Sequence, residues 1–507
     1  MTNPSPSSPR PLLALAMLAL MLVLAALDQT ILSTALLAIA HDLPGDVPLA
    51  WVFSAYLLTA TVVIALYGRL ADVWGSKQML LLAIALFLLG SLACGASQSR
   101  AQLVLARALQ GAGGGGLMTL TMLTVTSLFP PAQRGRFQAL LGASYGVATM
   151  FGPLVGGWMV EYISWHWAFW INAPLALLAW VVLATILPRA TRHNTPIDWW
   201  GAAALTVALV AALLATQHGS LQLPAALTLG ALLLIAATAA AAFVARQVRA
   251  AHPLVPPSLF RHPAYVAAAA IGLCSGLAMY AAVVFVPQYL QRMLHLSPTA
   301  SAWHLLPLMA GITGAAIASG KLLRAQVPAH RLSGVGSGLL ALSFAALCGS
   351  LAWAPTSATL ISVSLLPAGV GLGLLFPIFT LVSQRAAPPQ LTGIATATPV
   401  MLRSLGGSAG VALMAALLTQ RMTDELAPLR ALSAGAGTQA SAAAPAWLQD
   451  AMRTAMAHGL QSVFWYAAAA AVVALLASRW LAPQRVKTPT QPCYQHKNKL
   501  YRPPIKR

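Results

Sequence analysis

Long apolar stretches recur along the whole chain. Runs such as Leu80–Leu89 and Tyr466–Leu476 contain no charged residue, and about 20 apolar residues in a helix cross a hydrocarbon core about 30 Å thick. These runs do not alternate between polar and apolar positions, as the strands of a membrane β-barrel do. Lipid offers no hydrogen-bond partners, so the backbone of such a segment must form a helix. The pattern predicts an all-α polytopic membrane protein.

We expect about fourteen transmembrane helices, joined mostly by short loops. They are predicted near residues 12–40, 49–68, 78–98, 102–127, 137–160, 167–187, 197–217, 223–245, 264–287, 300–320, 333–353, 358–384, 393–418 and 459–481.

A basic, proline-rich linker at 246–263 separates eight predicted helices from six. If the seventh and eighth helices are an insertion, a six-helix group remains on either side, and internal symmetry of this kind is common in transporters. The expected organisation is a first six-helix bundle (1–188), two inserted helices with the linker (189–263), a second six-helix bundle with a long outer loop at 419–458 (264–482), and a basic cytoplasmic tail (483–507).

The charged residues give the expected orientation. Only 7% of residues are charged, against about 25% in soluble proteins. The net charge of +20 could indicate a nucleic-acid partner. If the N-terminus lies inside the cell, however, most of the 29 Lys and Arg residues fall on the inner side and six of the nine acids on the outer side. This asymmetry predicts cytoplasmic termini, and the basic tail is expected to contact anionic lipid headgroups rather than nucleic acid.

Two other sequence features concern processing and cofactor binding. The first apolar stretch could be a cleaved signal peptide, since Ala38-Ile39-Ala40 resembles a cleavage site; its length and the polar Asp28-Gln29-Thr30 favour a retained helix. The four cysteines have neither metal nor redox spacing. Neither a metal site nor a cofactor is therefore predicted.

Asp28 is the one acid that lies deep within an apolar stretch. Burying an ionised carboxylate costs several kcal/mol unless it is paired or faces water. A carboxyl group that is sealed in one state and opened to water in another can bind and release a proton, which a proton-coupled carrier needs. The alternative is a structural Asp that is held in a helix–helix hydrogen bond.

Two arginines also lie within predicted helices. Arg107 shares a helical face with Gly111, Gly114 and Met118, and it cannot lose its proton in a protein. It therefore requires a buried partner or a wet cavity, and Asp28 is the available carboxylate. Arg403 lies above a similar glycine-containing stripe in the second half. A purely structural role remains open for both.

Small residues line one side of the fifth predicted helix, and a charged turn follows the second. The small residues let helices approach closely, and this face suits either static packing or one bundle rocking on another; it comprises Gly142, Gly146, Gly152, Pro153, Gly156 and Gly157. In the turn, Arg69, Asp72 and Lys77 surround Gly75. They could latch two helices in one state, or they could form an ordinary solvated face.

Taken together, these stretches resemble the major facilitator superfamily, specifically its fourteen-span drug/proton antiporter branch of multidrug efflux permeases. The resemblance rests on Leu27-Asp28-Gln29-Thr30-Ile31, Gly68-Arg69-Leu70-Ala71-Asp72, Arg107-Ala108-Leu109-Gln110-Gly111, Gly152-Pro153-Leu154-Val155-Gly156-Gly157, Trp165–Pro174 and Arg403–Ser408. It implies two six-helix bundles plus two extra helices, alternating access between the bundles, Asp28 as proton carrier with Arg107 as coupling partner, and Asp72 and Lys77 in an inner gate. It also implies export. Val73 and Ser76 stand where the family usually has basic residues, so Arg134 or Arg136 could serve the gate instead.

The predicted function is proton-coupled antiport that exports small amphipathic organic compounds, driven by the proton gradient without a cofactor. The alternatives are a proton-coupled transporter of one metabolite or lipid-like compound, a membrane enzyme and a sensor, and the chain lacks the clustered polar groups that an enzyme requires. One intramembrane acid against two arginines disfavours dications. The expected partners are protons, lipids, the substrate and a periplasmic adaptor, and the expected location is a bacterial inner membrane. Candidate cavity residues are Trp51, Tyr56, Tyr145, Tyr280, Phe285 and Met401.

Overall fold

Every regular element in the described part of the chain is a helix. The computed structural model describes residues 9–45, 47–188, 196–216, 228–435 and 446–481. The first half holds α1 (Pro9–Asp42), α2 (Ala50–Trp74), α3 (Ser76–Gly95), α4 (Arg100–Leu128), α5 (Pro131–Tyr162), α6 (Trp167–Trp170) and α7 (Asn172–Ile186). Next come α8 (Trp199–Thr216) and α10 (Leu229–Arg249). The second half holds α11 (Pro263–Met293), α12 (Pro298–Trp303), α13 (Leu306–Arg324), α14 (Ala329–Trp353), α15 (Ala358–Ser364), α16 (Leu366–Ala386), α17 (Thr392–Gly435) and α18 (Ala446–Ser478).

Eleven helical segments of the described chain are long and apolar enough to cross a membrane. The helices α4 and α5 are outside this group, because glycine, threonine and charged residues lower their mean hydropathy, and α8 is a shorter apolar helix. Both α4 and α5 nevertheless pack lengthwise against apolar helices, α4 on α2 and α3 and α5 on α1 and α13. The polytopic all-α prediction is confirmed, whereas the count of fourteen spans is not.

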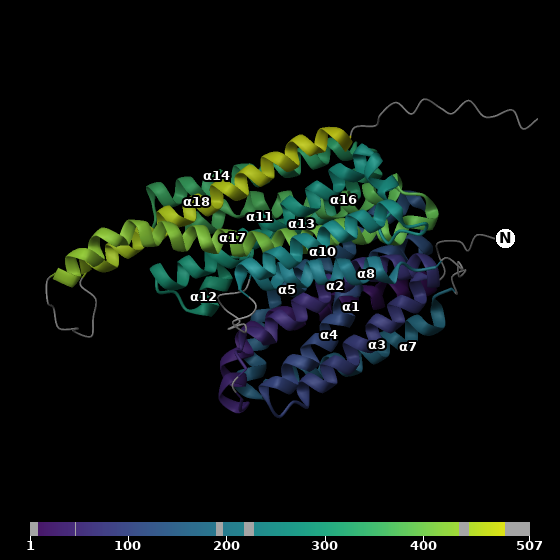
Figure 1. Cartoon of the computed structure of the whole chain (residues 1–507), viewed down its shortest axis with the longest axis horizontal. Coiled ribbons are helices and arrows are strands. Elements are labelled where there is room, and N and C mark those ends of the chain that lie inside the picture. The colour runs from purple at the N-terminus through teal and green to yellow at the C-terminus, as the bar shows by residue number, and fades with distance from the viewer. Residues whose placement is uncertain (1–8, 46, 189–195, 217–227, 436–445, 482–507) are drawn as a thin grey trace, which may run out of the picture.

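The helices form two groups that meet along a central seam (Figure 1). In the first group α1 packs on α5 and α3 on α4, and in the second group α11 packs on α17 and α13 on α16. Across the seam, α2 contacts α17 and α5 contacts α13. The pair α8 and α10 lies over the seam, where α8 contacts both α2 and α17.

A buried polar cluster holds the inserted pair together. Asp198 accepts hydrogen bonds from the Gly201 amide at 3.0 Å, from Arg246 at 3.1 Å and from Gln247 at 3.3 Å. Gln247 also accepts a bond from the Val255 amide at 2.9 Å, which anchors the chain that leads into the second half. The exposed face of α10 is apolar, including Leu234 at 65%, as expected for a surface that contacts lipid.

The prediction of a long loop at 419–458 is wrong over most of that range. Helix α17 continues to Gly435 and α18 begins at Ala446, so that helix occupies most of this segment. Its alanine-rich composition favours helix. The termini, including the basic tail at 483–507, lie outside the described residues.

Candidate functional site

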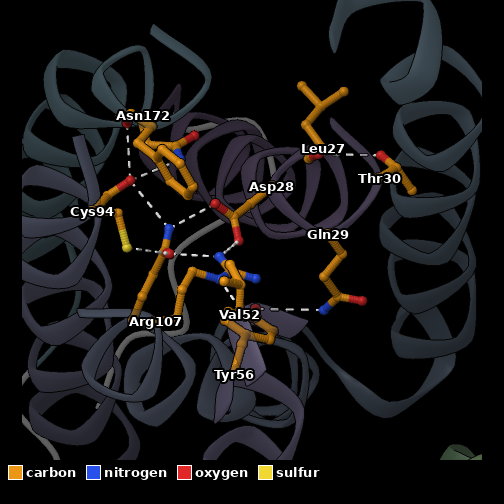
Figure 2. A network of polar contacts seen from close by, with 12 residues as sticks. Leu27, Asp28, Gln29, Thr30, Val52, Tyr56, Cys94, Arg107 and Asn172 are labelled. Atoms are coloured by element: carbon orange, nitrogen blue, oxygen red, sulfur yellow. Dashed lines mark hydrogen bonds and ion pairs between the residues drawn. The ribbon is translucent and has the colours of Figure 1, made fainter. Parts of the chain in front are cut away.

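Asp28 is buried between the helices of the first half. It is 2% exposed, and its Oδ2 lies 2.6 Å from the Nη1 atom of Arg107, which is 1% exposed. The Arg107 Nε–H also donates to the Val52 carbonyl at 3.2 Å. The structure thus brings together Asp28 and Arg107, two of the three intramembrane charges that the sequence indicated (Figure 2).

Gln110 completes this pair, and sequence reasoning gave it no role. Its side-chain amide donates to Asp28 Oδ1 at 2.7 Å, while its Oε1 accepts from Arg107 at 2.6 Å. Gln110 lies three residues after Arg107, a spacing that places both on one helical face. That spacing was the available signal, within the segment Arg107–Gly111 that carries the family resemblance.

A second layer of hydrogen bonds fixes the orientation of Gln110. Ser91 accepts from Gln110 at 3.1 Å and from Asn172 at 2.9 Å, and its hydroxyl donates to the Phe169 carbonyl at 2.9 Å. The network therefore joins α1, α3, α4, α6 and α7 through buried groups whose geometry leaves little freedom to the Asp28 carboxylate.

Aromatic rings cover the arginine. The Arg107 guanidinium carbon lies 4.3 Å from the centre of the Tyr56 ring and 5.8 Å from that of Phe169. The Tyr56 hydroxyl in turn accepts from Gln29 at 3.4 Å, as seen in Figure 2. This places Tyr56, a candidate cavity residue, against the charge pair and beside Gln29 of α1.

Close helix packing makes this geometry possible. A side chain at Gly111 would meet the backbone of Tyr56, and one at Gly90 would meet the backbone of Gln110. Glycine at these two positions lets α2, α3 and α4 approach until their polar groups can bond directly. The site holds the Asp28 carboxylate in a buried setting, with a hydrogen bond to each oxygen.

Arg403 lies at the seam without a carboxylate. It is 8% exposed, and the described groups that its guanidinium contacts are the sulfur atoms of Met118, at 3.4 Å, and Met279, at 3.9 Å. Its guanidinium carbon lies 5.3 Å from the centre of the Phe376 ring, and its Nε–H has no hydrogen-bond partner among the described groups. Arg107 and Arg403 therefore have different surroundings.

Asp72 bridges the two halves of the molecule. Its carboxylate accepts the backbone N–H groups of Gly393 at 2.6 Å and Ile394 at 3.0 Å, at the first turn of α17. The helix dipole favours a negative charge there. A side chain at Gly393 would meet the Gly68 carbonyl, so α2 and α17 cross in close contact. We call this end of the molecule, where α2 ends and α17 begins, the Asp72 end.

The basic residues expected beside Asp72 serve other contacts. Lys77 donates to the carbonyls of Ala184 at 2.7 Å and Leu187 at 2.6 Å, so it binds the end of α7 within the first half. Arg134 donates to the Phe129 carbonyl at 3.1 Å and is bound to its own α4–α5 turn. Arg69 is buried near Asp72 without forming an ion pair that bridges the halves. The contact that Asp72 makes between the two halves is therefore a carboxylate on a helix terminus rather than an ion pair.

The small-residue face of α5 divides between two neighbours. Gly146 lies against Ile312 and Thr313 of α13, in the second half, whereas Gly152 lies against Thr30 of α1, in its own half. Space is open beside Gly142. Pro153, Gly156 and Gly157 lie in the same helix. This face therefore contacts the second half at Gly146 and the first half at Gly152, and both static packing and rocking remain predictions for it.

The remaining cavity candidates lie in three separate places. Tyr145 lies in the neighbourhood of Tyr280 and Arg403. Phe285 and Met401 are 1% and 6% exposed and belong to the apolar core of the second half. Trp51 lies at the start of α2.

No group of three His, Cys, Asp or Glu residues within the described ranges could hold a metal ion.

The family model described as Major Facilitator Superfamily matches residues 18–411, a range that includes the residues of the charge network and those that Asp72 and Arg403 contact across the seam. The chain belongs to the major facilitator superfamily. Members of this superfamily are transporters and not enzymes, so the transporter prediction is confirmed at this level.

Similar proteins of the superfamily cover most of the chain. An MFS-type transporter of Mycobacterium tuberculosis (strain H37Rv) is 34% identical over 463 residues, which are 90% of this chain and 67% of that protein. The multidrug transporter protein MdtP of Bacillus subtilis is 32% identical over 421 residues, which are 80% of this chain and 75% of MdtP. The crystal structure of the human organic anion transporter MFSD10 superposes with a TM-score of 0.61 at 16% identity, covering 94% of this chain and all of that one, and this likeness concerns the fold alone.

Proposed function

We propose that this transporter is a proton-coupled antiporter that exports small amphipathic organic compounds. The observation that carries the proposal is the buried Asp28–Arg107–Gln110 network, in which one carboxylate neutralises the permanent positive charge of an arginine. Protonation of Asp28 would remove the partner of Arg107 and so would favour a rearrangement of α1 against α4. The similarity to a protein named as a multidrug transporter supports the export of organic compounds.

The proton gradient supplies enough energy for this exchange. One charge gains about 2.3 kcal/mol per 100 mV, and one pH unit is worth about 1.4 kcal/mol. A single proton could therefore sustain a substrate gradient of roughly a hundredfold to a thousandfold. Closure at the Asp72 end supports alternating access, since one end of the seam must open while the other stays closed.

The finer topology belongs to the same proposal. We place fourteen spans in the membrane, adding α4, α5 and α8 to the eleven apolar segments, because all three pack lengthwise among them. The Asp72 end faces the cytoplasm of a bacterial inner membrane, with both termini on that side, since the basic loops lie there. Anionic lipids at the basic tail, protons and the substrate are the expected partners, and a periplasmic adaptor would carry the substrate onward.

Transport by purified protein in proteoliposomes tests the proposal. An imposed pH gradient should drive substrate movement in the native protein and in an Asp424→Asn control, whose acid lies exposed near the far end of the membrane part of α17. Asp28→Asn keeps hydrogen-bonding groups beside Arg107 and Gln110 but cannot release a proton. It should bind substrate yet lose gradient-driven transport, whereas Asp28→Glu should retain part of it.

A panel of organic cations, neutral amphipaths, anions and single metabolites identifies the cargo in the same vesicles. Gradient-driven transport of every substrate by a folded Asp28→Asn protein would refute proton coupling at this site. Transport limited to one metabolite would refute the broad export function while leaving the coupling intact.

A further inference from the structure

Arg403 is a buried cation for which the described chain provides no anion. Arg107 has the Asp28 carboxylate at 2.6 Å, together with Gln110 and a carbonyl group. Arg403 is more than nine-tenths buried, and its described polar contacts are two methionine sulfurs, which are weak acceptors. Arginine stays charged in proteins, and an unpaired buried charge is costly. A site that keeps such a charge gains when an anion arrives.

The position of Arg403 suits a transported ligand. Its contacts come from α4 of the first half through Met118 and from α11 and α16 of the second half through Met279 and Phe376. It therefore lies on the seam, where motion of one half against the other changes its surroundings. Asp28, the one carboxylate among the described residues of this region, is already bound on both oxygens.

The surroundings also select the shape of the anion. Methionine side chains are flexible and polarizable and adapt to ligands of different shape, and Phe376 adds an aromatic face. Tyr145, which interacts electrostatically with Arg403 and Tyr280, adds a phenol. A guanidinium group presents a planar fork of donors that matches the two oxygens of a carboxylate or sulfonate. This arrangement combines one anion-binding point with an apolar, aromatic surface.

We infer that Arg403 is the substrate anchor, and that it selects amphipathic organic monoanions that carry one carboxylate or sulfonate on an aromatic body. The assignment rests on the proposed transport function and names its substrate class. In the substrate-free protein the methionine sulfurs and the Phe376 ring partly solvate the guanidinium, and the arriving anion displaces the Met118 contact. Neutral compounds with the same body bind the apolar surface but lack this ionic contact.

Three dansyl compounds with one fluorescent body and different charges test the assignment: dansylglycine as the monoanion, dansyl methylamide as the neutral compound and dansylcadaverine as the monocation. Binding is measured by fluorescence titration in nanodiscs of neutral phosphatidylcholine, which requires no transport. The native protein should bind dansylglycine at least tenfold more tightly than the other two. Arg403→Gln should remove that preference while leaving the affinity for dansyl methylamide within twofold, and Arg421→Gln, at an exposed position of the same helix, should behave like the native protein.

Arg403→Lys keeps the positive charge but loses the planar fork of guanidinium donors. It is the test variant if Arg403→Gln does not fold. It should bind dansylglycine several-fold more weakly than the native protein and dansyl methylamide unchanged. Equal losses for all three probes would mark Arg403 as structural and overturn the assignment, as would an unchanged preference for the anion in either variant. Loss of dansylglycine binding in nanodiscs with phosphatidylglycerol would instead assign the site to a lipid headgroup, which also overturns it.

The two proposals fail separately. Anion-selective binding without gradient-driven movement of any probe would refute the antiport function and keep the anion site. Gradient-driven movement of all three probes that does not depend on Arg403 would refute the anion site and keep the antiport function.

Discussion

The contact between Asp72 and the first turn of α17 gives the sharpest test of the closed seam. Asparagine at position 72 keeps the size of the side chain and one carbonyl oxygen, so it can accept one of the two backbone N–H groups of Gly393 and Ile394. It loses the second acceptor and the negative charge at the start of a helix. If closure of the Asp72 end depends on this carboxylate, Asp72→Asn shifts the protein toward a state that is open at this end.

The size of the shift follows from the contacts. A hydrogen bond to a charged group contributes about 1.5–3 kcal/mol, and a charge at a helix N-terminus about 0.3–1 kcal/mol. Asparagine retains a weaker, neutral hydrogen bond, so a net loss of about 2 kcal/mol is expected. With 1.4 kcal/mol for each factor of ten, the ratio of closed to open molecules should fall by roughly thirtyfold.

Double electron–electron resonance measures this population directly. Spin labels at Ser127 and Ala325, exposed positions at the ends of α4 and α13, report the separation of the halves once the four cysteines are replaced. The native protein should give mainly the short distance, and Asp72→Asn should add a longer one. Gly393→Ala, which forces α17 away from Gly68, should do the same by steric means.

The control for this measurement is Asp424→Asn. It removes an acid from the part of α17 that lies far from Asp72, so the distance between the two spin labels should not change. If Asp72→Asn is folded and keeps the native distance distribution, the carboxylate does not hold the two halves together, and the reasoning from these two hydrogen bonds is wrong.

Three further predictions concern the first half. Gly152→Ala should lower the melting temperature and slow transport, because the new methyl group would meet Thr30, whereas Gly142→Ala, where space is open, should leave both unchanged; equal effects would contradict the packing. Gln110→Leu should lower the free energy of unfolding in denaturant titrations by about 1–3 kcal/mol, because one Asp28 oxygen loses its donor; a fully stable variant with native pH dependence of transport would exclude a coupling role. Lys77→Met should lower the melting temperature by removing two hydrogen bonds at the end of α7, without lengthening the distance across the Asp72 end; a longer distance would restore Lys77 to the gate.

The sequence predicted those features of this protein that follow from the cost of moving charged and backbone polar groups from water into lipid. Apolar runs in a chain with few charges require lipid and helices, and the order of the short motifs indicated the superfamily. One carboxylate and two arginines inside apolar helices marked the polar centre, because each charge there needs a partner or a cavity. These inferences need only the cost of moving charge and backbone out of water, which depends little on three-dimensional detail.

Contacts between distant residues required the tertiary structure. A turn that contains Arg69, Asp72 and Lys77 does not reveal that Asp72 binds an amide pair more than three hundred residues away, or that Lys77 binds α7 instead. The composition of the segment 419–458 predicts a loop, yet helix occupies most of it, because alanine favours helix whether or not a segment is apolar enough to cross a membrane.

Arg107 and Arg403 show the division most clearly. Their sequence surroundings are alike, with a glycine-containing stripe below each guanidinium. Only the packing decides that Arg107 faces Asp28, while Arg403 faces two methionine sulfur atoms and an aromatic ring at the seam. Residue type alone determines that a buried arginine is charged, whereas the arrangement of neighbouring helices decides which group neutralises that charge.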